Sequence, residues 1–214
     1  MRVAEARVRL LPSEGLAPRL SRLPLAWARR WRSPWEEDAS PAVDVFVSRR
    51  ALVRVCAHAG SDLEREVGGA LVGTWRQERD TGRLFVVVDS ALRARHTRQG
   101  NSHVTFTQDT LVALHEELEQ RCPGKLFVGW YHTHPKFGVF LSGYDAWLHE
   151  HFFPEPWQIA LVVDPHAQEG GFFVWGQHGG LDPRAYVGFY ELLPRRRDSV
   201  VTWRNLSPEN ETGG

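Results

Sequence analysis

Strand-like and helix-like segments alternate through the middle of the chain, and this alternation constrains its fold more than any other feature. Short runs rich in β-branched and aromatic residues predict strands, and the segments between them carry apolar residues at helical spacing. The predicted strands cover residues 45–47, 67–75, 84–92, 103–106, 126–133, 157–164, 171–177 and 185–193, and the predicted helices begin at Ser48, Thr107 and Ser142. This mixture predicts a single α/β domain over about residues 43–194.

The two flanks differ from this domain. Residues 1–42 hold eight Arg, five acidic residues and three Trp spaced four apart, and their five prolines interrupt any long helix. The Trp spacing leaves open a short helix with one aromatic face before Pro34. We expect an extension that packs on the domain or frays, rather than a docking arm or a transit peptide, which would be poor in acids. Residues 195–214 are expected to form a polar, mobile tail.

Composition excludes several classes of protein. Lys and Arg total 26 and Asp and Glu total 26, so the electrostatic driving force for nucleic-acid binding is missing. No apolar run approaches the roughly 18–20 residues needed to span a membrane. Cys56 and Cys122 are the only cysteines, too few for a disulfide framework or a four-cysteine zinc site. We therefore expect a cytoplasmic protein that binds neither nucleic acid nor membranes.

The stretch VGWYHTHPKFGVFLSGYD, residues 128–145, carries the chemistry. Side chains alternate along a strand, so His132 and His134 point to the same face and can converge on one ion. Ser142 is well placed to cap a following helix, and Asp145 shares its face. Two imidazole nitrogens and one carboxylate oxygen, with a fourth position open, are typical of a catalytic zinc site. Such a zinc lowers the pKa of its water to about 7, but the sequence lacks HExxH, so the general base must come from elsewhere.

The HTHP sequence followed by six residues, Ser, two residues and Asp resembles the JAMM motif of MPN-domain metalloproteases. The flanking VGWY and LSG also match, and the resemblance extends over about residues 45–193. It implies a single MPN domain with a mixed β-sheet flanked by helices. It also implies one Zn²⁺ ion held by His132, His134 and Asp145.

The resemblance implies further roles. Glu66, in EVGGALVG, takes the place of the family's general base and acid, and Ser142 that of the donor to the oxyanion. An insertion at about residues 91–103 takes the place of the loop that pairs with an extended substrate tail. The substrate-binding residues expected there are Ala91, Arg93, Arg95 and His103.

The family's substrates are bonds that follow the Gly-Gly C-terminus of a ubiquitin-like protein. We therefore expect a zinc metalloprotease that deconjugates such a modifier, matures its precursor, or does both. The compact length is typical of a stand-alone prokaryotic form, which implies E1- and E2-like partners and, by analogy, a role in antiviral defence. The alternative is a non-enzymatic MPN scaffold or binding module that retains the metal site, and the complete Glu/His/His/Ser/Asp set favours the enzyme.

Three residues compete with these assignments. His149 lies one turn beyond Asp145, on its face, but as a fourth protein ligand it would close the water position. Glu64 competes with Glu66 as the base, and Glu66 is favoured because it adjoins VGGALVG. Cys122 with a His could imitate a thiol protease, although no cysteine signature surrounds it.

Overall fold

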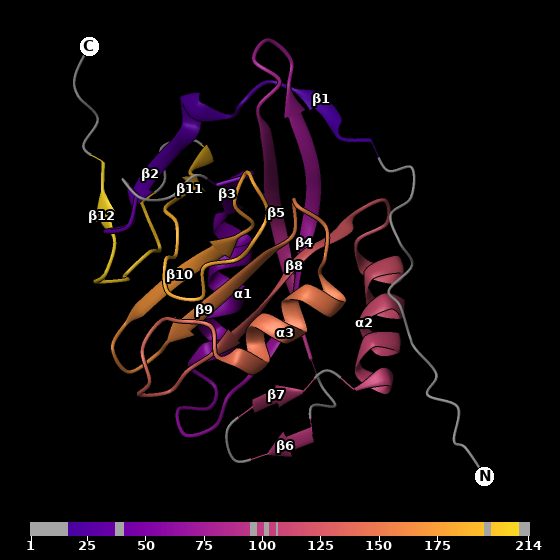
Figure 1. The fold of residues 1–214 in the computed structure, drawn as a ribbon, viewed down its shortest axis with the longest axis vertical. Coiled ribbons are helices and arrows are strands. Elements are labelled where there is room, and N and C mark those ends of the chain that lie inside the picture. Colours follow the sequence, from indigo (N-terminus) through magenta and orange to yellow (C-terminus); the bar gives the residue numbers. More distant parts are fainter. Residues whose placement is uncertain are drawn as a thin grey trace.

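The computed structural model describes residues 17–36, 41–94, 98–100, 103–105, 107–194 and 198–209. Ten of its strands form one mixed sheet in the order β10-β9-β8-β4-β5-β3-β11-β2-β12, with β1 paired to β4 (Figure 1). The strands are β1 (Arg19–Ser21), β2 (Ala28–Arg32), β3 (Asp44–Ser48), β4 (Gly68–Glu78), β5 (Leu84–Arg93), β6 (Arg98–Gly100), β7 (His103–Thr105), β8 (Leu126–Thr133), β9 (Ile159–Asp164), β10 (Glu169–Val174), β11 (Phe189–Leu192) and β12 (Ser207–Pro208). The sequence-based prediction of an α/β fold is therefore confirmed.

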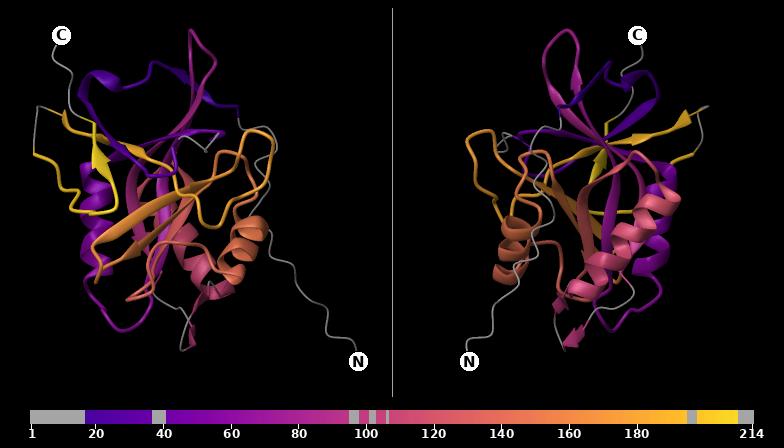
Figure 2. Two further views of the ribbon diagram at one scale, coloured as in Figure 1. Left: turned by 60° about the vertical axis from the view of Figure 1, so that its left-hand side comes forward. Right: turned by 90° about the vertical axis from the view of Figure 1, so that its right-hand side faces the viewer.

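Three α-helices cover the sheet. They are α1 (Arg49–Ala59), α2 (Gln108–Arg121) and α3 (Gly143–Phe152), and a 3-10 turn spans Leu25–Trp27. Each α-helix begins after the predicted cap: the hydroxyls of Ser48, Thr107 and Ser142 each accept a hydrogen bond from the backbone N–H three residues later. In the right-hand view of Figure 2, α1 and α2 lie on one side of the strands and α3 on the other.

Strand β4 lies between β5 and β8, its two antiparallel neighbours, which deliver residues to the same end of the sheet. It runs antiparallel to β5 and β8, with Gly68 opposite His132 and Gly69 opposite Arg93. Its register shifts against β5 between Val72 and Gly73. A Cβ at Gly73 would lie 1.9 Å from the Val87 carbonyl oxygen, so only glycine allows this close approach of the two strands.

The N-terminal extension packs on the domain over residues 17–36. Trp31, read from its spacing as a candidate helix residue, instead belongs to β2, where it is 7% exposed. Strand β2 pairs with β11 on one side and with β12 on the other. The short helix is therefore wrong, because pairing with distant strands outweighs local spacing.

The prediction of a polar, mobile tail is wrong for residues 198–209. Val201, Trp203 and Leu206 are buried in the core, and the Trp203 ring packs against the backbone of Gly170 in β10. The side chain of Asn205 both donates to the Gly170 carbonyl and accepts from its N–H, at 3.1 Å each. The segment thus covers the edge of the sheet, which protects β10 from pairing with another chain.

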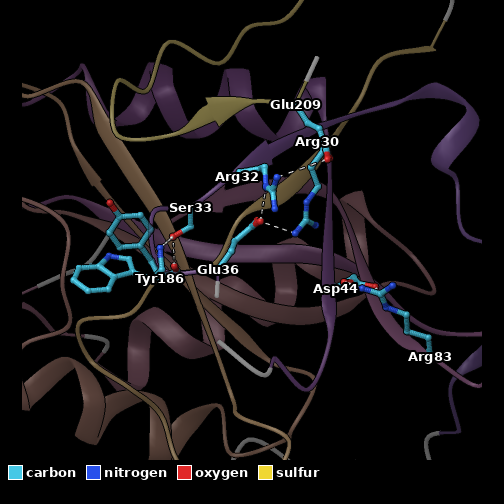
Figure 3. Close-up of polar contacts among 9 residues, drawn as sticks. Arg30, Arg32, Ser33, Glu36, Asp44, Arg83, Tyr186 and Glu209 are labelled. Atoms are coloured by element: carbon cyan, nitrogen blue, oxygen red, sulfur yellow. Dashed lines mark hydrogen bonds and ion pairs between the residues drawn. The ribbon is translucent and has the colours of Figure 1, made fainter. Parts of the chain in front are cut away.

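Polar contacts join the two terminal segments to each other and to the domain. Glu36 accepts from Arg30 and Arg32 at 2.8 and 2.9 Å within the N-terminal segment, and Arg32 faces Glu209 of the C-terminal segment at 4.0 Å (Figure 3). At a deeper level, the carboxylate of Glu191 in β11 is fully buried and accepts from Trp31 Nε1, Ser199 Oγ and the Val200 N–H. We call the contacts of Trp31, Ser199 and Val200 with Glu191 the terminal seam.

A search of the described residues for a helix long and apolar enough to cross a membrane found none.

Candidate metal centre

His132 and His134 lie where β8 ends, on the face of the sheet that α3 covers. Both side chains are buried, with 0% and 3% exposure. His134 follows the last residue of β8, and its N–H donates to the carbonyl of Val163 in β9 at 2.9 Å. The strand therefore continues far enough to present both imidazoles to the same side, as the alternation predicts.

Helix α3 brings the Asp145 carboxylate to the two histidines. Ser142 and Asp145 form a reciprocal cap: the Asp145 N–H donates to Ser142 Oγ at 3.2 Å, and the Ser142 N–H donates to Asp145 Oδ2 at 2.7 Å. The helix N-terminus favours the negative charge of Asp145. This carboxylate is 5% exposed and faces the two imidazoles.

The three groups converge at atomic distances. His132 Nε2 lies 2.9 Å from His134 Nε2 and 3.4 Å from Asp145 Oδ1, and His134 Nε2 lies 3.5 Å from Asp145 Oδ2. A tetrahedral ion with bonds of about 2.0–2.2 Å separates its ligand atoms by roughly 3.3–3.6 Å. The two histidine-to-carboxylate distances match this range, whereas the 2.9 Å between the two Nε2 atoms is shorter, so binding an ion would move the imidazoles slightly apart. The three residues form a metal-binding group within the part of the chain that the structure describes.

The charges of the site also suit a cation. Burial raises the pKa of the Asp145 carboxyl, but hydrogen bonds from His132 and His134 outweigh burial and hold this pKa below its usual range. The Nδ1 atoms of both histidines are buried and have no hydrogen-bond partner among the described residues. Two imidazoles and an ionised carboxylate are the ligand types that zinc prefers.

His149 takes part in the site indirectly. It is fully buried, and its Nδ1 accepts a hydrogen bond from Trp130 Nε1 at 3.0 Å. The Trp130 ring in turn stacks on the His132 ring, with centroids 4.6 Å apart. Burial lowers the pKa of His149 to about 3, so this imidazole is neutral. His149 is not in the metal-binding group and instead holds Trp130 through this hydrogen bond. Because side chains alternate along β8, the sequence places Trp130 on the same face of the strand as His132.

Glu66 lies two residues before β4, at the end of the sheet that holds the histidines. It is partly buried. Its neighbour Val67 exchanges two hydrogen bonds of 2.9 Å with Thr133, the residue between the two histidines. Glu64 is instead exposed and ion-paired with Lys136 Nζ at 2.9 Å, and this hydrogen bond lowers the pKa of Glu64. The backbone thus places Glu66 at the same end of the sheet as the metal-binding group, while Glu64 is engaged at the surface.

The predicted boundary of the insertion at residue 91 is wrong. Ala91 and Arg93 belong to β5, because the pairing of β5 with β4 continues to Arg93. Ala91 is 5% exposed and so offers no surface to a substrate. His103 begins β7, which pairs with β6 apart from the main sheet, and nothing is described of its side chain. Arg95 lies outside the described residues.

Comparison with known proteins finds a matching family and several similar proteins. The family model described as "JAB1/Mov34/MPN/PAD-1 ubiquitin protease" matches residues 40–153, just over half of the 214-residue chain. The chain is also similar to COP9 signalosome complex subunit 5 of Eremothecium gossypii, 32% identical over 181 residues that cover 81% of this chain and 38% of the relative. Subunit 5 of Candida albicans is 32% identical over 144 residues, which cover 64% of this chain and 22% of the relative. Subunit 5b of Arabidopsis thaliana is 32% identical over 176 residues, which cover 75% of this chain and 46% of the relative.

The chain therefore spans less than half the length of these curated relatives. Among solved structures, protein DSY2949 from Desulfitobacterium hafniense has a similar fold, with a TM-score of 0.50, 18% identity, and coverage of 72% of this chain and 99% of that one. The family match, together with the His-His-Asp group at the end of β8, identifies this chain as a member of the JAB1/Mov34/MPN/PAD-1 ubiquitin protease family.

Proposed function

We propose that this protein is a zinc-dependent isopeptidase or peptidase that cleaves after the Gly-Gly C-terminus of a ubiquitin-like modifier. The observation that carries the proposal is the convergence of His132 Nε2, His134 Nε2 and the Asp145 carboxylate, in a family described as ubiquitin proteases. These three residues would hold one zinc ion. Zinc bound there would supply a nucleophile at neutral pH and polarise the scissile carbonyl.

Two residues of the chain would do the remaining chemistry. The Glu66 carboxylate would take a proton from the attacking water and return it to the leaving amine. Its place follows from the pairing of Val67 with Thr133, which puts Glu66 at the same end of the sheet as the ligands. The Ser142 hydroxyl, fixed beside Asp145 by the helix cap, would donate to the developing oxyanion.

The segment after β5 would bind the modifier's tail. Gly69 of β4 pairs with Arg93 of β5 on one side and with Tyr131 of β8 on the other. Strand β5 therefore ends at the same end of the sheet as His132, with β4 between them. The chain then forms the small β6–β7 sheet before it enters α2. An extended tail that pairs with this segment would gain main-chain hydrogen bonds. Its glycines would pass the metal centre without steric clash.

The wider setting is also proposed. Cys56 and Cys122 are free, which is consistent with a reducing compartment such as the cytoplasm. E1- and E2-like enzymes would supply the conjugates, and a bacterial pathway, with a role in antiviral defence, remains part of the same proposal. The curated relatives are subunits of a complex, so a requirement for partners is tested alongside the activity.

The direct test is hydrolysis of a ubiquitin-like protein fused through Gly-Gly to a reporter, with the zinc-loaded protein. We expect cleavage after the second glycine, loss of cleavage on chelation, and recovery with zinc. The control is Glu66→Gln, which keeps the shape and the metal ligands but cannot accept the proton. Zinc binding without hydrolysis of any Gly-Gly fusion, alone or with E1- and E2-like proteins, would favour the scaffold alternative.

A further inference from the structure

Asp164, at the end of β9, has an environment that the proposed chemistry does not explain. Its carboxylate is 1% exposed and accepts four backbone hydrogen bonds. Oδ1 accepts from Lys136 at 3.3 Å, His166 at 2.9 Å and Ala167 at 3.1 Å, while Oδ2 accepts from Gly138 at 2.9 Å. Burial raises the pKa of Asp164, but these four bonds outweigh burial and keep the group ionised. One carboxylate thus joins the chain that follows the ligand His134 to the turn that follows β9.

Lys136 depends on this anchor. Its φ is 72°, in the left-handed region that a non-glycine residue enters at a cost. The bond from its N–H to Asp164 helps to hold this conformation. The conformation in turn sets the direction in which the Lys136 side chain leaves the backbone.

Both residues anchored by Asp164 reach the segment that carries Glu66. Lys136 Nζ contacts the two carboxylate oxygens of Glu64 at 2.9 and 3.1 Å. His166 Nε2 lies 2.8 Å from the Leu63 carbonyl oxygen, within hydrogen-bond distance. Two residues whose backbone N–H groups bond to one carboxylate therefore contact the chain just before Glu66 through their side chains.

The chain is held on the other side of Glu66 as well. Val67 is paired with Thr133 by two bonds of 2.9 Å. Asp62 shapes the turn before Glu66 by accepting from the N–H groups of Glu64 and Arg65 at 3.1 and 2.9 Å. Glu66 thus lies between a strand pairing and the two contacts that depend on Asp164. Its backbone position is fixed relative to the metal-binding group from both directions.

We infer that Asp164 is a positioning residue for Glu66, acting through Lys136 and His166. This inference deepens the proposed function and rests on it where Glu66 is concerned. A general base must lie within hydrogen-bond reach of the proton that it takes, and displacement by about 1 Å can cost up to about 100-fold in rate. The competing explanation is that Asp164 only stabilises the turn at residues 136–138.

The first experiment measures backbone hydrogen exchange over residues 63–67 in the full chain, which needs no activity. We expect exchange to rise at least about threefold in Asp164→Asn and in the double variant Lys136→Met/His166→Ala, because the segment loses its contacts. Arg121→Met is the matched control, since it also removes one surface ion pair, to Glu117 on α2, and should change nothing here. Unchanged exchange in the double variant would overturn the inference, whether or not the protein is an active enzyme.

The second experiment separates kcat from KM on the Gly-Gly fusion, with zinc content measured in each sample. For the double variant we expect kcat to fall about 10-fold, with KM and zinc content within about twofold of wild type. Lys136→Arg, which keeps the ion pair to Glu64, should retain more activity than Lys136→Met. The triple variant, which adds Asp164→Asn to the double variant, should have a kcat within twofold of the double variant's. The contacts through which Asp164 would act are already lost in the double variant.

These outcomes separate the two proposals. If wild type does not cleave the fusion, the proposed function fails, and the exchange experiment alone decides whether Asp164 positions the segment. If wild type is active and the double variant keeps full kcat, the inference is wrong while the proposed function stands. The double variant changes only exposed side chains, so a failure of Asp164→Asn to fold leaves this test intact.

Discussion

The metal centre and the terminal seam are each built around a buried carboxylate, and the two carboxylates have different surroundings. Glu191 in the seam is fully buried and accepts from Trp31 Nε1 at 3.1 Å, Ser199 Oγ at 2.6 Å and the Val200 N–H at 2.9 Å. Asp145 in the metal centre, 5% exposed, accepts from the Ser142 N–H, is hydrogen-bonded to the Ser142 side chain as well, and faces the Nε2 atoms of two histidines.

The difference separates a structural role from a functional one. Glu191 receives fixed N–H and O–H donors from chain segments far apart in sequence, so its hydrogen bonds tie the two terminal segments to the sheet. Asp145 meets two groups that can themselves act as electron-pair donors. Three such groups converging on one point favour a cation, which can take the place of the protons that they share. Burial alone therefore does not distinguish the two carboxylates, whereas the partners of their oxygens do.

The same chemical change in the two regions gives the sharpest comparison and the largest effect. Asp145→Asn removes one metal ligand, and we expect zinc content to fall well below one equivalent and hydrolysis to fall by about 1,000-fold or more. Its thermal unfolding without zinc should stay close to that of zinc-free wild type. Metal analysis, turnover of the Gly-Gly fusion and calorimetry check these points. Full activity in this variant would remove Asp145 from the site.

The matching variant in the seam, Glu191→Gln, should act on stability. The amide retains one acceptor oxygen but places N–H hydrogens against donors from Ser199 or Trp31, so we expect a loss of about 2–4 kcal/mol in the free energy of unfolding. Turnover per folded molecule and zinc content should remain at the wild-type values. Denaturant unfolding measures the loss, and a specific defect in turnover would show that the seam is coupled to the metal centre.

A third comparison concerns histidines outside the metal-binding group. His58 is buried against Tyr131, with its Nδ1 2.9 Å from the tyrosine hydroxyl oxygen, on the face of β8 opposite the metal centre. Burial, with a smaller contribution from Arg93, lowers its pKa from 6.5 to about 4. The folded state therefore binds fewer protons than the unfolded state between these values, and stability is full above pH 6.5 and falls as the pH drops towards 4.

The expected loss from His58 over this interval is about 3 kcal/mol. His58→Gln keeps an acceptor for Tyr131 but does not titrate, so its unfolding free energy should fall less steeply between pH 6.5 and 4. Urea unfolding at several pH values in zinc-free protein provides the measurement. Identical slopes for the two proteins would mean that His58 does not titrate as a buried neutral group.

The smallest effect concerns the contact of the tail with the sheet edge. A Cβ at Gly170 would lie 2.5 Å from the Trp203 ring, so Gly170→Ala should displace this ring and lower stability by about 1 kcal/mol. Gly60→Ala is the control, because its Cβ would meet only the Cys56 carbonyl oxygen at 3.5 Å. Equal stability of the two variants would show that Trp203 moves aside freely.

Features set by neighbouring residues could be predicted from the sequence. Strand β8 has the predicted bounds, because its alternation is fixed by backbone geometry over eight residues. The Ser142 cap also depends on a contact only three residues away. These two local patterns are sufficient to predict the metal-binding group without any tertiary contact.

The features that could not be predicted depend on distant partners. Trp31 and Glu191 are 160 residues apart, and the four-residue Trp spacing leaves open a helix in a segment that pairs as β2. Trp203 lies in a polar segment, and its ring can pack there only because Gly170, in another strand, has no side chain. Asp164 was visible only as the end of a predicted strand. Its four hydrogen bonds come from two loops whose meeting no local pattern encodes.

Anomalous X-ray scattering at the zinc edge tests whether His132, His134 and Asp145 hold a single zinc ion. We expect one anomalous peak between His132 Nε2, His134 Nε2 and the Asp145 carboxylate. Bonds should be about 2.0–2.1 Å to nitrogen and about 2.0–2.2 Å to oxygen, and the peak should be lost in Asp145→Asn crystals. Zinc-saturated crystals with no peak there, or with the peak on other ligands, would show that these three residues do not form the zinc site.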